Sequence, residues 1–173
     1  MWVFAYGSLM SEPWEEQFRG TRRGPAVLRG YRRAFSKSST QNWGTKERPC
    51  PTLGLEPDEE ARCIGLLYEF PDPARDSVLA FLQHREGKSF SFPQLQVELD
   101  DGSKVHALVP VNDRSRASYI GELPLTQRAK MARDAAGEKG RCIDYVKAIR
   151  TDLKQIGVVD RDVEDFWRSV HDP

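Results

Sequence analysis

Cysteine is scarce in this 173-residue chain, and the few that occur do not form a familiar cysteine-built site. Cys50, Cys63 and Cys142 are odd in number and lack C-x-x-C spacing, so neither a disulfide framework nor a structural zinc site has support, and at most one bridge can form. The three histidines are also far apart and match no metal-ligand pattern. We therefore expect no bound metal.

Net charge and long apolar runs are lacking as well. Lys plus Arg and Asp plus Glu each total 26, which argues against a globally cationic protein that binds nucleic acid or a membrane surface. The apolar run Trp2–Tyr6 carries no cationic leader, and Gly7-Ser8 ends it before it reaches the length of a secretory segment or a membrane span. We expect a cytoplasmic protein with no membrane partner. The length and the 39% hydrophobic content predict one folded domain over residues 1–173.

The hydrophobic pattern places strands in the first two thirds of the chain and helices in the last third. The predicted strands are 2–6, 26–35, 52–55, 63–70, 94–99 and 105–111, and the predicted helices follow Asp72-Pro73 up to Gly87 and then cover 126–136 and 143–156, with a last one capped by Asp160. The acidic turn 57–60 predicts a hairpin of strands 52–55 and 63–70, and the turn 100–103 predicts a second. Residues 36–51 have the composition of a long loop. This order indicates an α+β domain.

The first candidate binding element is the turn Tyr6-Gly7-Ser8-Leu9. A strand runs into a glycine that allows close backbone approach, so the N–H groups of Gly7, Ser8 and Leu9 are candidates for binding an anion such as a carboxylate. The structural alternative is an ordinary turn, which is the commonest role of a Gly-Ser pair.

The second candidate is Glu86, which ends a predicted packed helix. The helix dipole disfavours a negative charge there, and burial would act in the same direction, so both would raise the pKa of Glu86 and suit it to act as a general base. The alternative is a solvated side chain paired with Arg85 or Lys88 at a frayed helix end. In the first case, Arg85 could orient Glu86.

A basic stretch follows the first turn. Nine Lys or Arg residues against one acidic residue lie between Arg19 and Arg48, a surplus of eight that would attract an anionic ligand. Arg48 is a candidate for binding a second carboxylate, although a solvated loop charge is the simpler role. Cys50 lies in this stretch, but without a nearby histidine it is better explained as a small buried residue than as a nucleophile. Nucleic-acid binding through Arg19–Arg33 is the weakest alternative.

Several segments, taken in order, resemble the ChaC-like γ-glutamylcyclotransferases. The matching segments are Trp2–Met10, Gly30–Phe35, Gly44–Pro49, Phe81–Glu86 and Gly121–Pro124. Together they extend over nearly the whole chain, and the combination of Tyr6–Leu9 with Arg85-Glu86 is the most specific part.

The resemblance implies a γ-glutamylcyclotransferase-like fold, a small mixed β-barrel-like sheet with flanking helices. It implies an activity on glutathione that yields 5-oxoproline and cysteinylglycine, with no cofactor. By motif match, Glu86 would be the catalytic carboxylate, and Tyr6, Gly7, Ser8 and Leu9 would bind the γ-glutamyl group. Relatives often carry a tyrosine where this chain has Phe90, a departure that bears on the choice of γ-glutamyl substrate.

Two alternatives stay open within this resemblance. The protein could cyclise other γ-glutamyl amines or dipeptides, since only the acceptor part of the pocket would differ. It could also be a non-catalytic module that binds γ-glutamyl compounds, although the presence of Glu86 argues against that role. Assays for 5-oxoproline with several γ-glutamyl compounds separate these alternatives.

Overall fold

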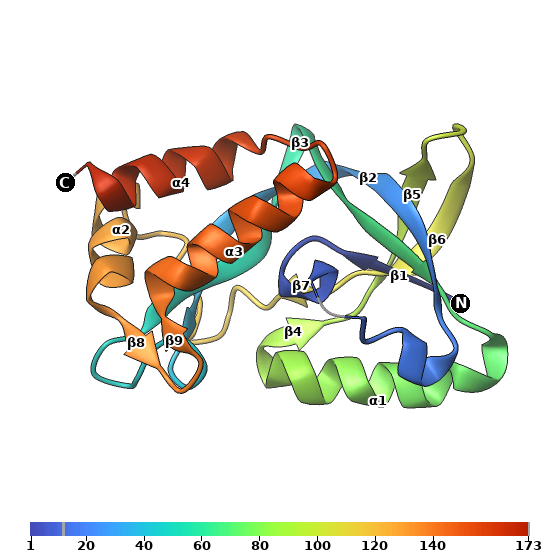
Figure 1. The fold of residues 1–173 in the computed structure, drawn as a ribbon, viewed down its shortest axis with the longest axis horizontal. Helices are drawn as coiled ribbons and strands as arrows, with labels where there is room; N and C mark the ends of the chain where they lie inside the picture. Colours follow the sequence, from blue (N-terminus) through green and yellow to red (C-terminus); the bar gives the residue numbers. More distant parts are fainter. Residues whose placement is uncertain (12, 173) are drawn as a thin grey trace. The chain divides into compact units, whose positions relative to one another are not determined.

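A closed five-stranded barrel and four α-helices form the framework of the computed structural model, which describes residues 1–11 and 13–172 (Figure 1). The strands are β1 (Trp2–Ala5), β2 (Thr21–Ser39), β3 (Cys50–Glu69), β4 (Phe90–Ser91), β5 (Gln94–Leu99), β6 (Lys104–Leu108), β7 (Val111–Asn112), β8 (Ala136–Gly137) and β9 (Gly140–Arg141). The helices are α1 (Arg75–Glu86), α2 (Leu125–Asp134), α3 (Cys142–Gln155) and α4 (Arg161–His171), and short 3₁₀ turns cover Ser8–Met10, Glu16–Phe18, Asp72–Ala74 and Gly87–Ser89.

The barrel strands follow the order β1-β3-β2-β5-β6, and the ring closes between β6 and β1. The β1–β6 pair is parallel, whereas β1–β3, β2–β5 and β5–β6 are antiparallel, so the sheet is mixed. Closure leaves no edge at which the short β1 would be unpaired. These features confirm the α+β class and the mixed barrel-like sheet.

Contacts along the chain divide it into two units. Unit 1 contains residues 1–31 and 57–113, and unit 2 contains the remaining described residues, 32–56 and 114–172. Inward-facing strand residues form the core of unit 1, among them Phe4, Leu28, Leu67, Val97 and Ala107. Each unit is assembled from two separate stretches of chain. The expectation of one domain over 1–173 stays a prediction.

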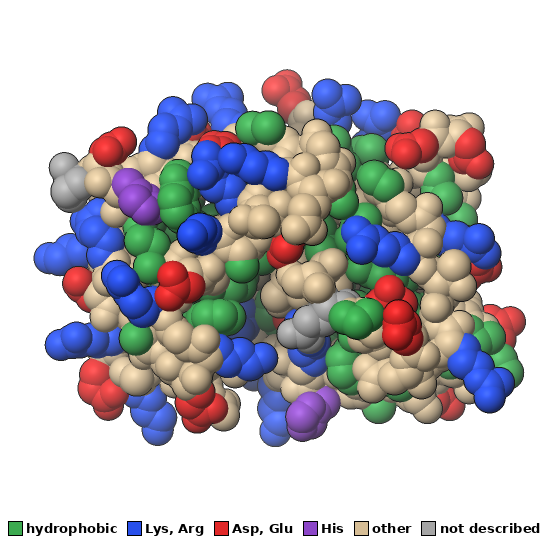
Figure 2. Space-filling model, in the orientation of Figure 1, with side chains coloured by type: hydrophobic (Ala, Val, Ile, Leu, Met, Phe, Trp, Pro, Cys, Tyr) green, Lys and Arg blue, Asp and Glu red, His purple; other side chains and the backbone are tan. Residues whose placement is uncertain are grey.

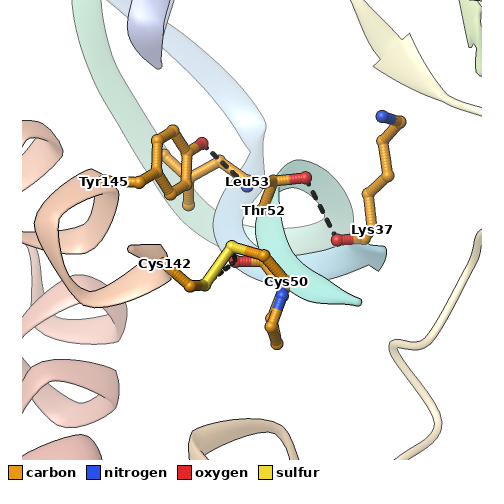
Figure 3. Close-up of a disulfide and its surroundings, with 7 residues drawn as sticks. Lys37, Cys50, Thr52, Leu53, Cys142 and Tyr145 are labelled. Atoms are coloured by element: carbon orange, nitrogen blue, oxygen red, sulfur yellow. Dashed lines mark hydrogen bonds between the residues drawn. A yellow bond between two sulfur atoms is a disulfide. The ribbon is translucent and has the colours of Figure 1, made fainter. Parts of the chain in front are cut away.

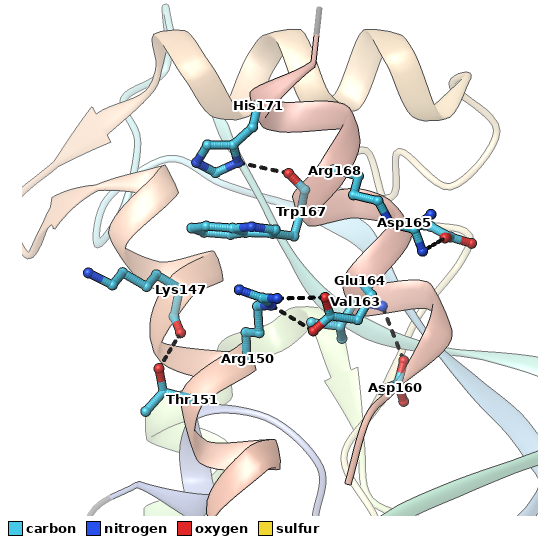
Figure 4. A network of polar contacts seen from close by, with 10 residues as sticks. All are labelled: Lys147, Arg150, Thr151, Asp160, Val163, Glu164, Asp165, Trp167, Arg168 and His171. Atoms are coloured by element: carbon cyan, nitrogen blue, oxygen red, sulfur yellow. Dashed lines mark hydrogen bonds and ion pairs between the residues drawn. The ribbon is translucent and has the colours of Figure 1, made fainter.

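In unit 2 the core lies between strand residues and the last helices. The Phe35 ring stacks on Phe166 of α4 with ring centroids 3.9 Å apart, and Val146, Ile149 and Leu153 of α3 are buried at helical spacing. Asp160 caps α4, because its carboxylate accepts a hydrogen bond from the backbone N–H of Val163 at 3.1 Å (Figure 4). The expected cap and the periodicity of α3 are thus confirmed.

The same region carries a polar contact between the last two helices. The guanidinium of Arg150 on α3 donates two hydrogen bonds to Glu164 on α4, at 2.6 and 2.8 Å, and lies over the ring of Trp167 (Figure 4). The hydrogen bonds from Arg150 lower the pKa of Glu164 below its ordinary value.

Three sequence predictions are wrong in detail. Residues 52–55 and 63–70 do not form a hairpin, because β3 continues without a turn through the acidic segment, whose Pro57, Glu59 and Glu60 are exposed. The local preference of these residues for a turn is outweighed by their pairing within the sheet. The predicted loop 36–51 shrinks to 40–49, because β2 and β3 extend into it. The cap at Asp72 is absent, since its side chain makes no cap hydrogen bond and α1 begins only at Arg75.

Candidate active site

The turn after β1 is a single 3₁₀ turn over Ser8–Met10 with Gly7 at its N-cap. The N–H of Met10 donates to the carbonyl of Gly7 at 2.9 Å and closes the turn. The N–H groups of Ser8 and Leu9 begin the turn and therefore have no acceptor within it. Tyr6, directly before the turn, is buried. The expected strand-to-glycine turn is therefore present, with two backbone N–H groups at its start.

Two buried aromatic side chains fix the end of this turn. The indole Nε1 of Trp14 and the hydroxyl of Tyr68 on β3 both donate to the carbonyl oxygen of Leu9, at 3.0 and 3.3 Å. Trp14 also stacks on Phe81 of α1, with ring centroids 5.4 Å apart and planes 7° from parallel. The turn and α1 are thus held by a common aromatic cluster. Sequence reasoning missed Trp14 and Tyr68, because nothing in their spacing predicts a shared contact with Leu9.

Glu86 is the last residue of α1, as predicted. The helix packs through Val78 and Leu82, which are buried, and ends because Gly87 adopts a φ of +73° that favours glycine. The side chain of Glu86 is 19% exposed. It is therefore not the solvated helix-end residue of the structural alternative, although it pairs with Arg85, as that alternative expected.

Arg85 contacts both halves of the candidate site. Its Nη2 donates to the carbonyl oxygen of Ser8 at 3.3 Å, and its Nε lies 3.8 Å from Oε1 of Glu86. The structure therefore brings the turn and the carboxylate of Glu86 to the same guanidinium. The predicted rise in the pKa of Glu86 stays a prediction, and the positive charge of Arg85 acts against it.

Arg48 lies in unit 2, in the segment between β2 and β3, and is exposed. Its backbone closes a local turn, because the N–H of Thr45 donates to the carbonyl of Arg48 at 3.0 Å and the N–H of Arg48 donates to Oγ1 of Thr45 at 3.1 Å. Its predicted contact with a substrate carboxylate stays a prediction.

Cys50 is not the free buried cysteine expected from the sequence. It forms a disulfide with Cys142 at the start of α3, and both residues are fully buried (Figure 3). Nearby, the N–H of Leu53 donates to the hydroxyl of Tyr145 at 3.1 Å. A sulfur held in this bond is not available as a nucleophile. Cys63 is buried and lies outside this disulfide.

The basic surplus of residues 19–48 is partly neutralised within each unit. In unit 1, Arg23 pairs with Glu69 and Arg29 with Glu98; in unit 2, Arg32 pairs with Asp162 and Arg33 with Asp160. Figure 2 shows acidic side chains among the basic ones across the visible face. This pairing weakens the expected attraction of an anionic ligand by the whole stretch, and it also weakens the nucleic-acid alternative.

Residues 1–11 and 13–172 contain neither a metal-ligand cluster nor a membrane-spanning helix. No group of three or more His, Cys, Asp or Glu side chains there is arranged to hold a metal ion. No helix in these ranges is both long and apolar enough to cross a bilayer.

The fold of the chain is similar to that of a solved enzyme structure. A crystal structure of a glutathione-specific γ-glutamylcyclotransferase from yeast superposes with a TM-score of 0.88 at 20% identity, covering 99% of this chain and 95% of that one. The chain therefore has the fold of that protein.

The amino-acid sequence is similar to one protein family over almost its whole length. Residues 1–172 match the ChaC-like protein family, and the chain belongs to it. It is 32% identical to "Gamma-glutamylcyclotransferase 2-3" of Arabidopsis thaliana, over 98% of this chain and 88% of that protein. It is 29% identical to the "Glutathione-specific gamma-glutamylcyclotransferase" of Escherichia coli K12, over 98% of this chain and 72% of that protein. The resemblance noted in the sequence is confirmed.

Proposed function

We propose that this protein is a γ-glutamylcyclotransferase that converts glutathione into 5-oxoproline and cysteinylglycine. Two relatives named as γ-glutamylcyclotransferases match nearly the whole chain, and one of them is named as glutathione-specific. The observation in the structure that supports it best is the half-buried carboxylate of Glu86, tied through Arg85 to the carbonyl of Ser8 in the turn after β1.

The reaction needs little besides a folded substrate and a base. The α-amine of the γ-glutamyl group attacks its own γ-carbonyl carbon, so the nucleophile is already tethered, and positioning of this kind supplies up to roughly 7–11 kcal/mol of the barrier. A carboxylate base adds about 10²–10⁴-fold. One carboxylate and one binding turn are thus enough for this reaction.

In the proposed mechanism Glu86 accepts a proton from the α-ammonium group, and the freed amine forms a bond to the γ-carbon. The bond between that carbon and the cysteine nitrogen then breaks as Glu86 returns its proton to the leaving nitrogen. The ring nitrogen then loses a second proton to solvent or to the same carboxylate. The leaving amine takes up one proton from the same source. The products are a lactam and a free ammonium group, so no redox partner is needed.

We place the γ-glutamyl group at Tyr6, Gly7, Ser8 and Leu9. The N–H groups of Ser8 and Leu9 would donate either to the α-carboxylate of the substrate or to the oxyanion that develops on the γ-carbonyl. Arg48 remains a proposed contact for a second carboxylate. In this arrangement, backbone groups of one short turn provide most of the binding site.

A product assay tests this function. Purified protein is incubated with glutathione, with γ-glutamyl dipeptides and with a γ-glutamyl amine, and 5-oxoproline is measured for each. Glutathione should give 5-oxoproline and cysteinylglycine in equal amounts. Turnover of the other compounds alone would reassign the substrate, and calorimetric binding of glutathione without any product would support a non-catalytic module instead.

We also infer that the protein works in the cytoplasm, because its proposed substrate, glutathione, is a thiol and the cytoplasm keeps thiols reduced. Thiol-rich compartments reduce accessible disulfides, and full burial of Cys50 and Cys142 would protect their bond there. Cell fractionation with an antibody against the protein tests the location, and recovery in a membrane or exported fraction would contradict it.

A further inference from the structure

We propose that Arg85 is a positioning residue for this reaction, because its guanidinium holds the carboxylate of Glu86 in place relative to the Ser8 end of the binding turn. This inference rests on the proposed function. Two contacts carry it: the hydrogen bond from Nη2 to the Ser8 carbonyl at 3.3 Å, and the approach of Nε to Oε1 of Glu86 at 3.8 Å.

The contact between Arg85 and Glu86 is not what a regular helix provides. Side chains at positions i and i+1 of an α-helix do not face each other. These two residues stand at the very end of α1, where Gly87 leaves the helical conformation with a φ of +73°. We infer that the helix end lets the two side chains turn toward each other, with the Ser8 carbonyl fixing the guanidinium.

Burial makes the charge of Arg85 effective. The side chains of Arg85 and Glu86 are 21% and 19% exposed, so water screens their interaction less than on an open surface. Arginine stays charged at all relevant pH values. Its charge therefore favours the ionised form of Glu86, which is the form that can accept the proton of the substrate ammonium.

Two separate nitrogens are needed for this role. Nη2 serves the turn while Nε faces the carboxylate, a division that the planar fork of arginine allows and the single ammonium of lysine does not. Lysine at this position should keep a positive charge near Glu86 but lose the simultaneous contact with Ser8. It is the conservative variant that separates charge from positioning.

The test compares Arg85→Gln, Arg85→Lys and a control, Arg75→Gln, which makes the same chemical change at the exposed start of α1. Arg85→Gln should lower kcat with glutathione by about 10²-fold, the scale expected when a reacting group is displaced by about 1 Å, with a much smaller change in KM. The acidic limb of its kcat/KM profile should move to higher pH by about one unit. Arg85→Lys should restore the acidic limb to its wild-type position but recover only part of the lost kcat. Arg75→Gln should match the wild type.

A second measurement keeps the inference independent of turnover. In protein carrying ¹³C-labelled glutamate, the titration of the Glu86 carboxyl is followed by NMR, with Glu86→Gln used to assign its signal. The midpoint should rise in Arg85→Gln and not in Arg75→Gln, whether or not the protein turns over glutathione. The inference is overturned if Arg85→Gln titrates as the wild type, or if it keeps wild-type kcat with an unchanged pH profile. It is also overturned if Arg85→Lys is as impaired in every respect as Arg85→Gln.

Discussion

Loss of the Cys50–Cys142 disulfide should strongly destabilise the folded protein. The two cysteines are 92 residues apart in the sequence, so the bond restricts a long loop of the unfolded chain. The chain-entropy relation gives about 4.6 kcal/mol at 25 °C for a loop of this length. For a protein of this size, that loss lowers the Tm by roughly 10–18 °C.

Differential scanning calorimetry measures this effect. Because both cysteines are fully buried, the bond is best reduced in denaturant, and the protein is then refolded with reductant present. The double variant Cys50→Ala/Cys142→Ala should have a low Tm that reductant does not change further. Cys63→Ala, which alters the buried cysteine outside the disulfide, should keep the full response to reductant. Equal Tm values for oxidised and reduced wild-type protein, with the bond verified by peptide mapping, would refute the reasoning.

Three further predictions follow from local contacts. Trp14→Phe removes the indole donor to the Leu9 carbonyl, so it should cost about 1 kcal/mol of stability and raise KM for glutathione as the turn loosens. Gly87→Ala forces an L-residue into a φ of +73° and a ψ of −172°, a region almost exclusive to glycine, and should cost about 1–3 kcal/mol in denaturant unfolding. The pKa of Glu164 is lowered, chiefly by its hydrogen bonds from Arg150. The ionised side chain therefore contributes its full stabilisation when the pH is above 4.5, the ordinary pKa of this group. That contribution is lost as the pH falls through the lower pKa of the folded state. Glu164→Gln should therefore reduce the loss of stability on acidification.

Each of these predictions has a result that would contradict it. Trp14→Phe with wild-type stability and KM would show that the Leu9 carbonyl does not need the indole. Gly87→Ala as stable as the wild type would remove the argument from backbone conformation. An unchanged acid-unfolding profile in Glu164→Gln would mean that the bond to Arg150 does not contribute in solution.

Features set by neighbouring residues could be predicted from the sequence. The periodicity of α3 and the cap at Asp160 depend on residues within a few positions of each other, and the structure contains both. The same holds for the glycine turn after β1 and for Glu86 at the end of α1, since an apolar stripe followed by Gly87 marks a helix end. The motifs in these local segments also carried the family resemblance.

Features that depend on distant residues could not be predicted. Pro57 and its acidic neighbours have the composition of a turn, and only pairing along the sheet shows that β3 continues through them. The partners Cys50 and Cys142 have no spacing signal at a separation of 92 residues. The contacts of Trp14 and Tyr68 with Leu9 likewise depend on how the chain returns to the turn. Tertiary packing, rather than local preference, decides these points.

The role of Glu86 is tested most directly by 5-oxoproline release from glutathione in Glu86→Gln beside the wild type. Glutamine keeps the size of the side chain but cannot accept the proton, so we predict a loss of turnover by at least about 10²-fold, with circular dichroism showing an intact fold. Turnover close to that of the wild type in the folded variant would contradict the account, because the reaction would then proceed without the carboxylate assigned as its base.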